Sequence, residues 1–257
     1  MGLVIFFTNM NKIIFLTLLS WFKSCSMREW SVEDYFKREH SLIKPYQGAG
    51  TGIPHWDFLG STMVTNNYIR ITSDVQSLQG AIWNKIPCHI QHWEMQIHFK
   101  VHGKGKDLFW RWIHILHVHP YISAMINNGT LHYDHDRDGT HTQLAGCGSK
   151  FRNLNHDTYL SIKYLKDVLT VSTNIDNSGE FKECFSVQGV ILPTGYYFGV
   201  SAATGALTDN HDILALRLYD LTSSEVEVED RSNVAPSASF FEAPRDSVHN
   251  KFNESLN

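Results

Sequence analysis

A short run of carboxylates, YDHDRDGT at positions 133–140, has the residue types that bind a metal ion. Three aspartates alternate before a glycine, which matches the first half of an EF-hand loop, D-x-D-x-D-G: Asp134, Asp136, Asp138 and Gly139. The twelfth position of such a loop needs a bidentate glutamate, but here it is Ala145. Two interpretations remain, a charged turn or a loop that shares a calcium ion with oxygen ligands from elsewhere in the chain.

Three histidines lie in a second run, LFWRWIHILHVHP at 108–120: His114, His117 and His119. On a β-strand His117 and His119 would share one face, and His114 would point to the other. Because zinc needs three or four converging ligands and no Cys or Glu adjoins the run, we do not expect a zinc site. The apolar length is too short for a membrane span, and a substitute strand is the remaining structural interpretation.

The chain carries none of the common catalytic motifs. G-x-S-x-G, H-E-x-x-H and the P-loop are absent, and no strand-like segment has the alternating carboxylates of a sandwich glycosidase. The formal net charge is −4 and no basic stripe is present, which argues against a nucleic-acid partner. We therefore expect a non-catalytic protein and keep a glycosidase only as a third hypothesis.

The elements that would position these residues are strands. WEMQIHFKV at 93–101 alternates apolar and polar side chains with a period of two. The same alternation recurs at 158–165, 168–175 and 213–221, and turns rich in Asp, Asn and Gly separate the segments. No long helical periodicity appears between residues 40 and 222, so the pattern favours an all-β sandwich or barrel.

The two ends of the chain differ in composition from the middle. Lys12, an apolar run at 13–22 and small residues at Ser24 and Ser26 are typical of a secretory signal peptide, for which Met10 is an alternative start. Residues 223–257 are polar and acidic, with no periodic apolar face and no apolar span. We expect a signal peptide at 1–26, a domain at 33–222 and a polar tail at 223–257.

The cysteines and sequons are consistent with an oxidising compartment. Removal of the signal peptide with Cys25 leaves three cysteines, which predict one disulfide bond and one free thiol: Cys88, Cys147 and Cys184. Asn128 and Asn253 begin N-x-[ST] sequons. Asn128 lies in the turn-like stretch NNGT and is the expected glycosylation site.

Five collinear blocks carry a resemblance to a known family: KREHSLIKPYQGAGTGIPHWDFLGS, PCHIQHWEMQIHFKVHGKGK, PYISAMINNGTLHYDHDRDG, AGCGSKFRN and LPTGYYFGVSAATGALTDNHD. Together they resemble the animal L-type, legume-lectin-like cargo receptors, in particular the vesicular integral-membrane branch. The resemblance covers roughly residues 36–222. It implies a concanavalin-like antiparallel β-sandwich that binds high-mannose glycans on cargo glycoproteins with the help of calcium, in the endoplasmic reticulum, the intermediate compartment and the Golgi.

The resemblance also implies roles for individual residues. Ser77 and His135 match sugar-contacting residues of the family, and Asp138 matches a calcium ligand. Residues Gly205, Ala206 and Leu207 stand where the family has Gly-Asp-Leu, in a loop that contacts mannose. Ala206 replaces the aspartate of that pattern. Cys147 and Cys184 match the disulfide bond of the family.

One segment departs from the family pattern. Residues 107–119 stand where the family has a longer segment with a G-D-G block and a D-T-Y-P-N block, which supply a sugar contact and most calcium ligands. We interpret the junction as an altered exon boundary or an incomplete gene record, and we expect a sandwich with missing strands. The resemblance also implies a membrane anchor. Residues 223–257 contain no apolar span that could serve as one. The rival hypothesis is a soluble lectin-like protein that has lost its sugar and acts through protein contacts.

Overall fold

The structure is a computed structural model that describes residues 35–46, 52–105, 120–130, 142–222 and 229–238. The chain divides by its contacts into residues 1–34 and 35–257, and every described residue belongs to the second unit. The expected signal peptide at 1–26 and the three histidines of the run at 108–120 lie outside the described residues. The described secondary structure is almost entirely β, which confirms the expected all-β class.

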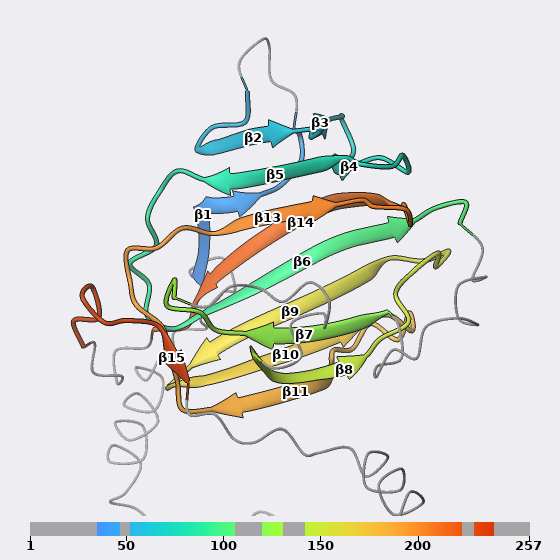
Figure 1. The fold of residues 1–257 in the computed structure, drawn as a ribbon. Helices are drawn as coiled ribbons and strands as arrows, with labels where there is room; N and C mark the ends of the chain where they lie inside the picture. Colours follow the sequence, from blue (N-terminus) through green and yellow to red (C-terminus); the bar gives the residue numbers. More distant parts are fainter. Residues whose placement is uncertain (1–34, 47–51, 106–119, 131–141, 223–228, 239–257) are drawn as a thin grey trace, which may run out of the picture. The chain divides into compact units, whose positions relative to one another are not determined.

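An eight-stranded antiparallel sheet forms one layer (Figure 1). Its strands follow the order β11-β10-β9-β6-β14-β4-β3, and β1 also pairs with β14. The bounds of these strands are β1 Phe36–Leu42, β3 Met63–Val64, β4 Ile69–Thr72, β6 Trp93–His102, β9 Thr158–Leu165, β10 Val168–Asn174, β11 Lys182–Gln188 and β14 Asn210–Asp220.

Two smaller sheets lie against this layer (Figure 1). One has three strands in the order β13-β5-β2, and the other pairs β7 with β8. A short pair, β12-β15, completes the described sheets. The bounds are β2 Trp56–Gly60, β5 Gln79–Asn84, β7 Tyr121–Met125, β8 Gln143–Gly148, β12 Val190–Ile191, β13 Gly199–Ala203 and β15 Ser237–Ala238.

Two apolar clusters fill the space between the layers. The larger joins β6, β4 and β14 of the large sheet to β2 and β5, and its fully buried members are Leu42, Ile69, Ile71, Ile82, Leu216 and Leu218. The second is built on β9, β10 and β11, with partly buried residues of β7 and β8 packed against it. Burial of apolar surface on both facing layers is what holds a β-sandwich together.

The alternation in β6 occurs as predicted, whereas β14 departs from strict alternation. Met95 is buried and Trp93, Ile97 and Phe99 pack against the same cluster. In β14 the register with β6 shifts between Ile213 and Ala215, which is a β-bulge or similar irregularity. A bulge advances one strand by one residue, so the buried side of the strand changes at this point.

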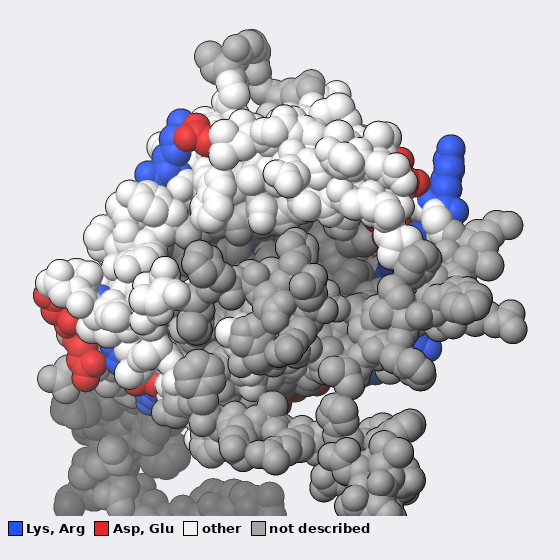
Figure 2. All heavy atoms as spheres, viewed as in Figure 1, with Lys and Arg blue, Asp and Glu red and all other residues white. Residues whose placement is uncertain are grey.

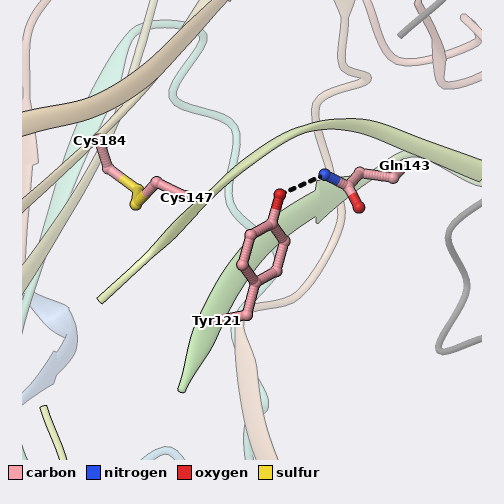
Figure 3. The surroundings of a disulfide bond; sticks show 4 residues. All are labelled: Tyr121, Gln143, Cys147 and Cys184. Atoms are coloured by element: carbon pink, nitrogen blue, oxygen red, sulfur yellow. Dashed lines mark hydrogen bonds between the residues drawn. A yellow bond between two sulfur atoms is a disulfide. The ribbon is translucent and has the colours of Figure 1, made fainter. Parts of the chain in front are cut away.

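The disulfide bond implied by the resemblance is present. Cys147 on β8 is bonded to Cys184 on β11, with 5.7 Å between their Cα atoms (Figure 3). Nearby, the Gln143 amide donates a hydrogen bond of 2.9 Å to the Tyr121 hydroxyl across the β7-β8 pair. Cys88 is free and buried, and burial raises the pKa of its thiol to about 11. The thiol is therefore protonated and unreactive at neutral pH.

Residues 229–238 differ from the polar tail expected from composition. The Arg231 guanidinium is almost fully buried, and it donates hydrogen bonds to the Asp167 carboxylate at 2.5 Å and the Tyr164 hydroxyl at 3.0 Å. Beyond it, β15 pairs with β12. The composition of the segment does not indicate this packing, because the partners of Arg231 lie 64 and 67 residues earlier in the chain.

Replacing Arg231 with alanine is expected to lower the free energy of unfolding by about 2 kcal/mol. A buried hydrogen bond to a charged group contributes roughly 1.5–3 kcal/mol, and water compensates for part of the loss at Asp167, whose side chain is 38% exposed. Urea denaturation of the full chain measures the loss. Glu229→Ala is the matched control, since its carboxylate also contacts Arg231 but its side chain is 69% exposed. Equal losses in the two variants would show that the buried contacts of Arg231 do not stabilise the fold.

Candidate functional site

The loop before β5, which contains Ser77, and the loop after β13, which contains residues 204–207, come together at one end of the sandwich. Both loops lie at the right-hand end in Figure 1. The buried Thr204 hydroxyl donates to the Val75 carbonyl at 2.7 Å and accepts the Leu78 amide at 2.9 Å. The Gln76 amide also donates to the Ala206 carbonyl at 3.3 Å. Thr204 therefore fastens the two loops to each other, although sequence reasoning did not single it out.

The local backbone sets how Ser77 is presented. Its φ of 59° lies in the left-handed region, which non-glycine residues adopt rarely and mostly in turns. Ser77, Gly205 and Ala206 are exposed, and Leu207 is 64% exposed. The result is an accessible surface of one hydroxyl, several backbone groups and one apolar side chain.

Asp74 connects this pair of loops to the turn after β6. Its carboxylate accepts hydrogen bonds from the Thr208 hydroxyl and from the Lys104 amide, the latter at 2.8 Å. Its own amide donates to the Asn210 side chain at 3.0 Å. The hydrogen bond from Thr208, followed by that from Lys104, lowers the pKa of Asp74. The carboxylate is thus ionised at neutral pH and holds three chain segments.

An ion pair between Arg152 and Asp209 connects a further loop to the site. Arg152 donates two hydrogen bonds to Asp209, at 2.7 and 2.9 Å, and a third to the Gly105 carbonyl at 2.9 Å. Gly103 is required at the meeting point, because a Cβ atom there would lie 2.1 Å from an Asp209 carboxylate oxygen. Two-point arginine–carboxylate pairing fixes orientation as well as distance.

Beneath the loops lies a buried ionic cluster. Asp212, at 4% exposure, accepts two hydrogen bonds from Arg70 at 2.7 and 2.8 Å, and its second oxygen lies 3.0 Å from His102 Nε2. Beside it, His211 Nδ1 lies 2.7 Å from the Thr72 hydroxyl. These residues join β4, β6 and β14 where the site loops begin. Asn210, His211 and Asp212 form the first residues of β14.

The other expected site residues are only partly covered. His135 and Asp138 lie outside the described residues, as do His114, His117 and His119. Asn128 is described and exposed, and its side-chain oxygen accepts a hydrogen bond of 2.6 Å from the Thr130 hydroxyl. Its accessibility fits a glycan acceptor.

Metal binding and membrane crossing have no counterpart in the described residues. In the ranges that the structure covers, no three His, Cys, Asp or Glu side chains gather in a way that could hold a metal ion. The same ranges contain no helix that is long and apolar enough to span a bilayer.

Burial of histidines gives the fold a pH dependence. Desolvation is the largest influence on four of them and lowers the pKa of each below 6.5: His40, His92, His98 and His211. Below about pH 6.5 the unfolded chain then binds more protons than the folded chain. The stability that the neutral, buried histidines contribute is therefore complete above about pH 6.5 and is lost as the pH falls below it.

We therefore expect the free energy of unfolding to be lower at about pH 5.5 than at about pH 7.5. Urea denaturation at the two values tests this, since the carboxylates with lowered pKa do not titrate in that window. The His211→Asn variant should show a smaller difference between the two pH values. An unchanged or greater stability at the lower pH would contradict the assignment.

The sandwich and its loop cluster define a lectin-like class of protein. The legume-like lectin family matches residues 33–118 and 113–228, and the chain belongs to this family. Human vesicular integral-membrane protein VIP36 is 44% identical over 255 residues, covering 84% of this chain and 72% of that protein. Human VIP36-like protein is 44% identical over 236 residues, covering 77% and 68%.

A solved structure agrees with these sequence relatives. The exoplasmic/lumenal domain of VIP36 with calcium and mannose bound superimposes with a TM-score of 0.75 at 43% identity. The match covers 81% of this chain and all of that domain. The expected family and the antiparallel β-sandwich are thereby confirmed.

Proposed function

We propose that this protein is a lectin that binds high-mannose N-linked glycans on cargo glycoproteins and catalyses no reaction. The observation that carries the proposal is the fastening of the Ser77 loop to the 204–207 loop through Thr204. The likeness to a domain solved with mannose bound supports the same ligand class. The lumen of the endoplasmic reticulum, the intermediate compartment or the Golgi is the matching location.

The chemistry of the site suits a neutral sugar. Mannose presents hydroxyl groups, so recognition requires fixed donors and acceptors rather than a strong charge. The Ser77 hydroxyl and the backbone of Gly205, Ala206 and Leu207 would supply them, with His135 as a further contact. Asp138 would hold calcium, which takes six to eight oxygen ligands and therefore needs other groups as well.

Retention of the full mature chain on immobilised high-mannose glycan tests the proposal. We expect retention in calcium, release by a chelator and competition by free mannose. Retention that persists in the chelator would show that calcium is not required for glycan binding. No retention in calcium would overturn the lectin assignment.

Replacing Ala206 with aspartate is expected to strengthen retention on mannose by about tenfold, equivalent to ~1.4 kcal/mol. The resemblance implies an acid at this position, and a charge-assisted hydrogen bond to a sugar hydroxyl is stronger than a neutral one. Ala206 is exposed and lacks a positive φ, so the fold accommodates the change. Ala206→Asn is the control of similar size, and an equal gain in both variants would contradict the role of the charge.

A second candidate is a lectin-like protein that no longer binds sugar and acts through protein contacts. The alanine at 206 and the departure at 107–119 favour it, because both remove groups that the resemblance assigns to sugar and calcium. The two candidates differ in the retention experiment. The second candidate is supported if the folded chain is not retained on the glycan in calcium and the Ala206→Asp variant is not retained either.

A further inference from the structure

The loop after β8 is fixed to the large sheet. Phe151 packs edge-on against Phe99 of β6, with 5.5 Å between the ring centroids, and Phe99 in turn packs against the larger apolar cluster. Two residues further on, the Asn153 amide donates a hydrogen bond of 2.9 Å to the Val101 carbonyl, also on β6. Arg152 lies between these two contacts, so its backbone is held on both sides.

The same loop also holds the turn that follows β6. The Asn153 side chain accepts a hydrogen bond from the Gly103 amide at 2.9 Å and donates one to the Gly103 carbonyl at 3.2 Å. The φ of Asn153 is 56°, in the left-handed region that asparagine adopts more readily than most residues. Arg152 adds its hydrogen bond to the Gly105 carbonyl. The loop and the turn therefore form one unit, and none of these residues is an expected sugar contact.

Arg152 connects this unit to the site loops through Asp209. Its guanidinium donates to both carboxylate oxygens, and the two side chains are only 21% and 17% exposed. Asp209 follows Thr208, whose hydroxyl donates to the Asp74 carboxylate. Asp74 in turn begins the loop that contains Ser77. A continuous series of contacts thus leads from Arg152 to that loop.

Two carboxylates, Asp74 and Asp209, are brought together by these contacts. Thr208 contacts the first through its hydroxyl and directly precedes the second. Nearby like charges repel each other, so the arrangement needs compensating cations. The hydrogen bond from Thr208 is the main cause of the lowered pKa of Asp74, and the charges of Lys104 and Arg152 add to it. Acidic and basic atoms adjoin at the right-hand end of the molecule, where the site loops lie (Figure 2).

We propose that Arg152 is a positioning residue for the glycan site, which orders the Ser77 loop and the 204–207 loop through Asp209 and thereby sets the affinity for mannose. The inference rests on the proposed function and assigns the site a supporting residue. Arginine suits this role because its planar fork fixes the orientation of a carboxylate, whereas lysine supplies the charge alone. Loops that are ordered in advance lose less conformational entropy when a ligand binds.

Hydrogen exchange of the full mature chain, without sugar, tests the ordering of the loops. The amides of Leu78 and Thr204 report on it, because each is hydrogen-bonded to the other residue. In Arg152→Met we expect both amides to exchange about tenfold faster, while amides of β9 and β10 exchange as in the parent. A role in overall stability alone would accelerate exchange in β9 and β10 as well.

Titration with free mannose in calcium measures the affinity. We expect Arg152→Met to weaken binding by about tenfold, and Arg152→Lys to weaken it less because the charge is kept. The lysine variant provides the same comparison if Arg152→Met does not fold. Asp209→Asn should weaken binding to a similar extent. The double variant Arg152→Met/Asp209→Asn should bind no more weakly than the weaker single variant, because both changes remove one contact.

Lys37→Met is the matched control. Lys37 pairs with Asp220 at 3.1 Å, with side chains 32% and 21% exposed, and Asp220 ends β14 whereas Asp209 directly precedes it. This variant should leave mannose affinity and the exchange of Leu78 and Thr204 unchanged.

Unchanged exchange of the two loop amides in Arg152→Met would overturn the proposal, as would additive losses in the double variant. An equal loss of affinity in Lys37→Met would overturn it too, because the effect would then follow general stability. If the parent chain does not bind mannose, the proposed function fails together with the effect on affinity. The exchange result still decides separately whether Arg152 orders the loops.

Discussion

Replacing Asp212 with alanine is expected to lower the free energy of unfolding by about 3 kcal/mol or more. The Asp212 side chain is 5% exposed and that of Arg70 is 18% exposed, so water screens their interaction little. Removing the carboxylate leaves the guanidinium without the partner of its two short hydrogen bonds. An uncompensated buried charge costs far more than the net contribution of the pair.

Equilibrium denaturation of the full chain measures this loss, and a variant that lacks both charges assigns it to the unpaired guanidinium. The Arg70→Met/Asp212→Leu variant removes both charges and should recover a large part of the stability lost in Asp212→Ala. Asp57→Ala is the surface control, because Asp57 pairs with Lys85 while both side chains are more than half exposed. A loss in Asp212→Ala no greater than that in Asp57→Ala would show that the cluster does not stabilise the fold.

Removing the disulfide bond is expected to cost about 4 kcal/mol in the Cys147→Ser/Cys184→Ser variant. The two cysteines are 37 residues apart, and closing a loop of this length restricts the unfolded chain by about that amount in the chain-entropy estimate. The bond also connects β8 to β11, and so joins the β7-β8 pair to the large sheet. We expect β7 and β8 to open first in the variant.

Urea denaturation under non-reducing conditions, combined with hydrogen exchange, tests both parts of this expectation. Cys88→Ser is the control, because it removes a thiol that forms no disulfide bond. The single variants Cys147→Ser and Cys184→Ser should each lose as much stability as the double variant. A double variant as stable as the parent, with unchanged exchange in Tyr121–Met125 and Gln143–Gly148, would contradict the role of the bond.

The sequence alone determined the local elements and the class of protein. Strict alternation predicted β6, β9 and β10, since a strand between two environments must place its side chains on alternating faces. The five resembling blocks predicted the sandwich, the family and the bond between Cys147 and Cys184. These features depend on neighbouring residues or on collinear motifs, which a sequence displays directly.

Only the tertiary structure decided which distant residues meet. Asp212 and Arg70 are 142 residues apart, and Thr204 lies 126 residues from Leu78. The packing of Arg231, which lies in an acidic and polar stretch, could not be predicted because its partners are also distant in the sequence. Such partners are set by sheet order and by the irregularity in β14, where a shift of one residue changes which side chains face the core. Periodicity indicates on which face of a strand each side chain lies, whereas register and sheet order determine which residues of other strands it contacts.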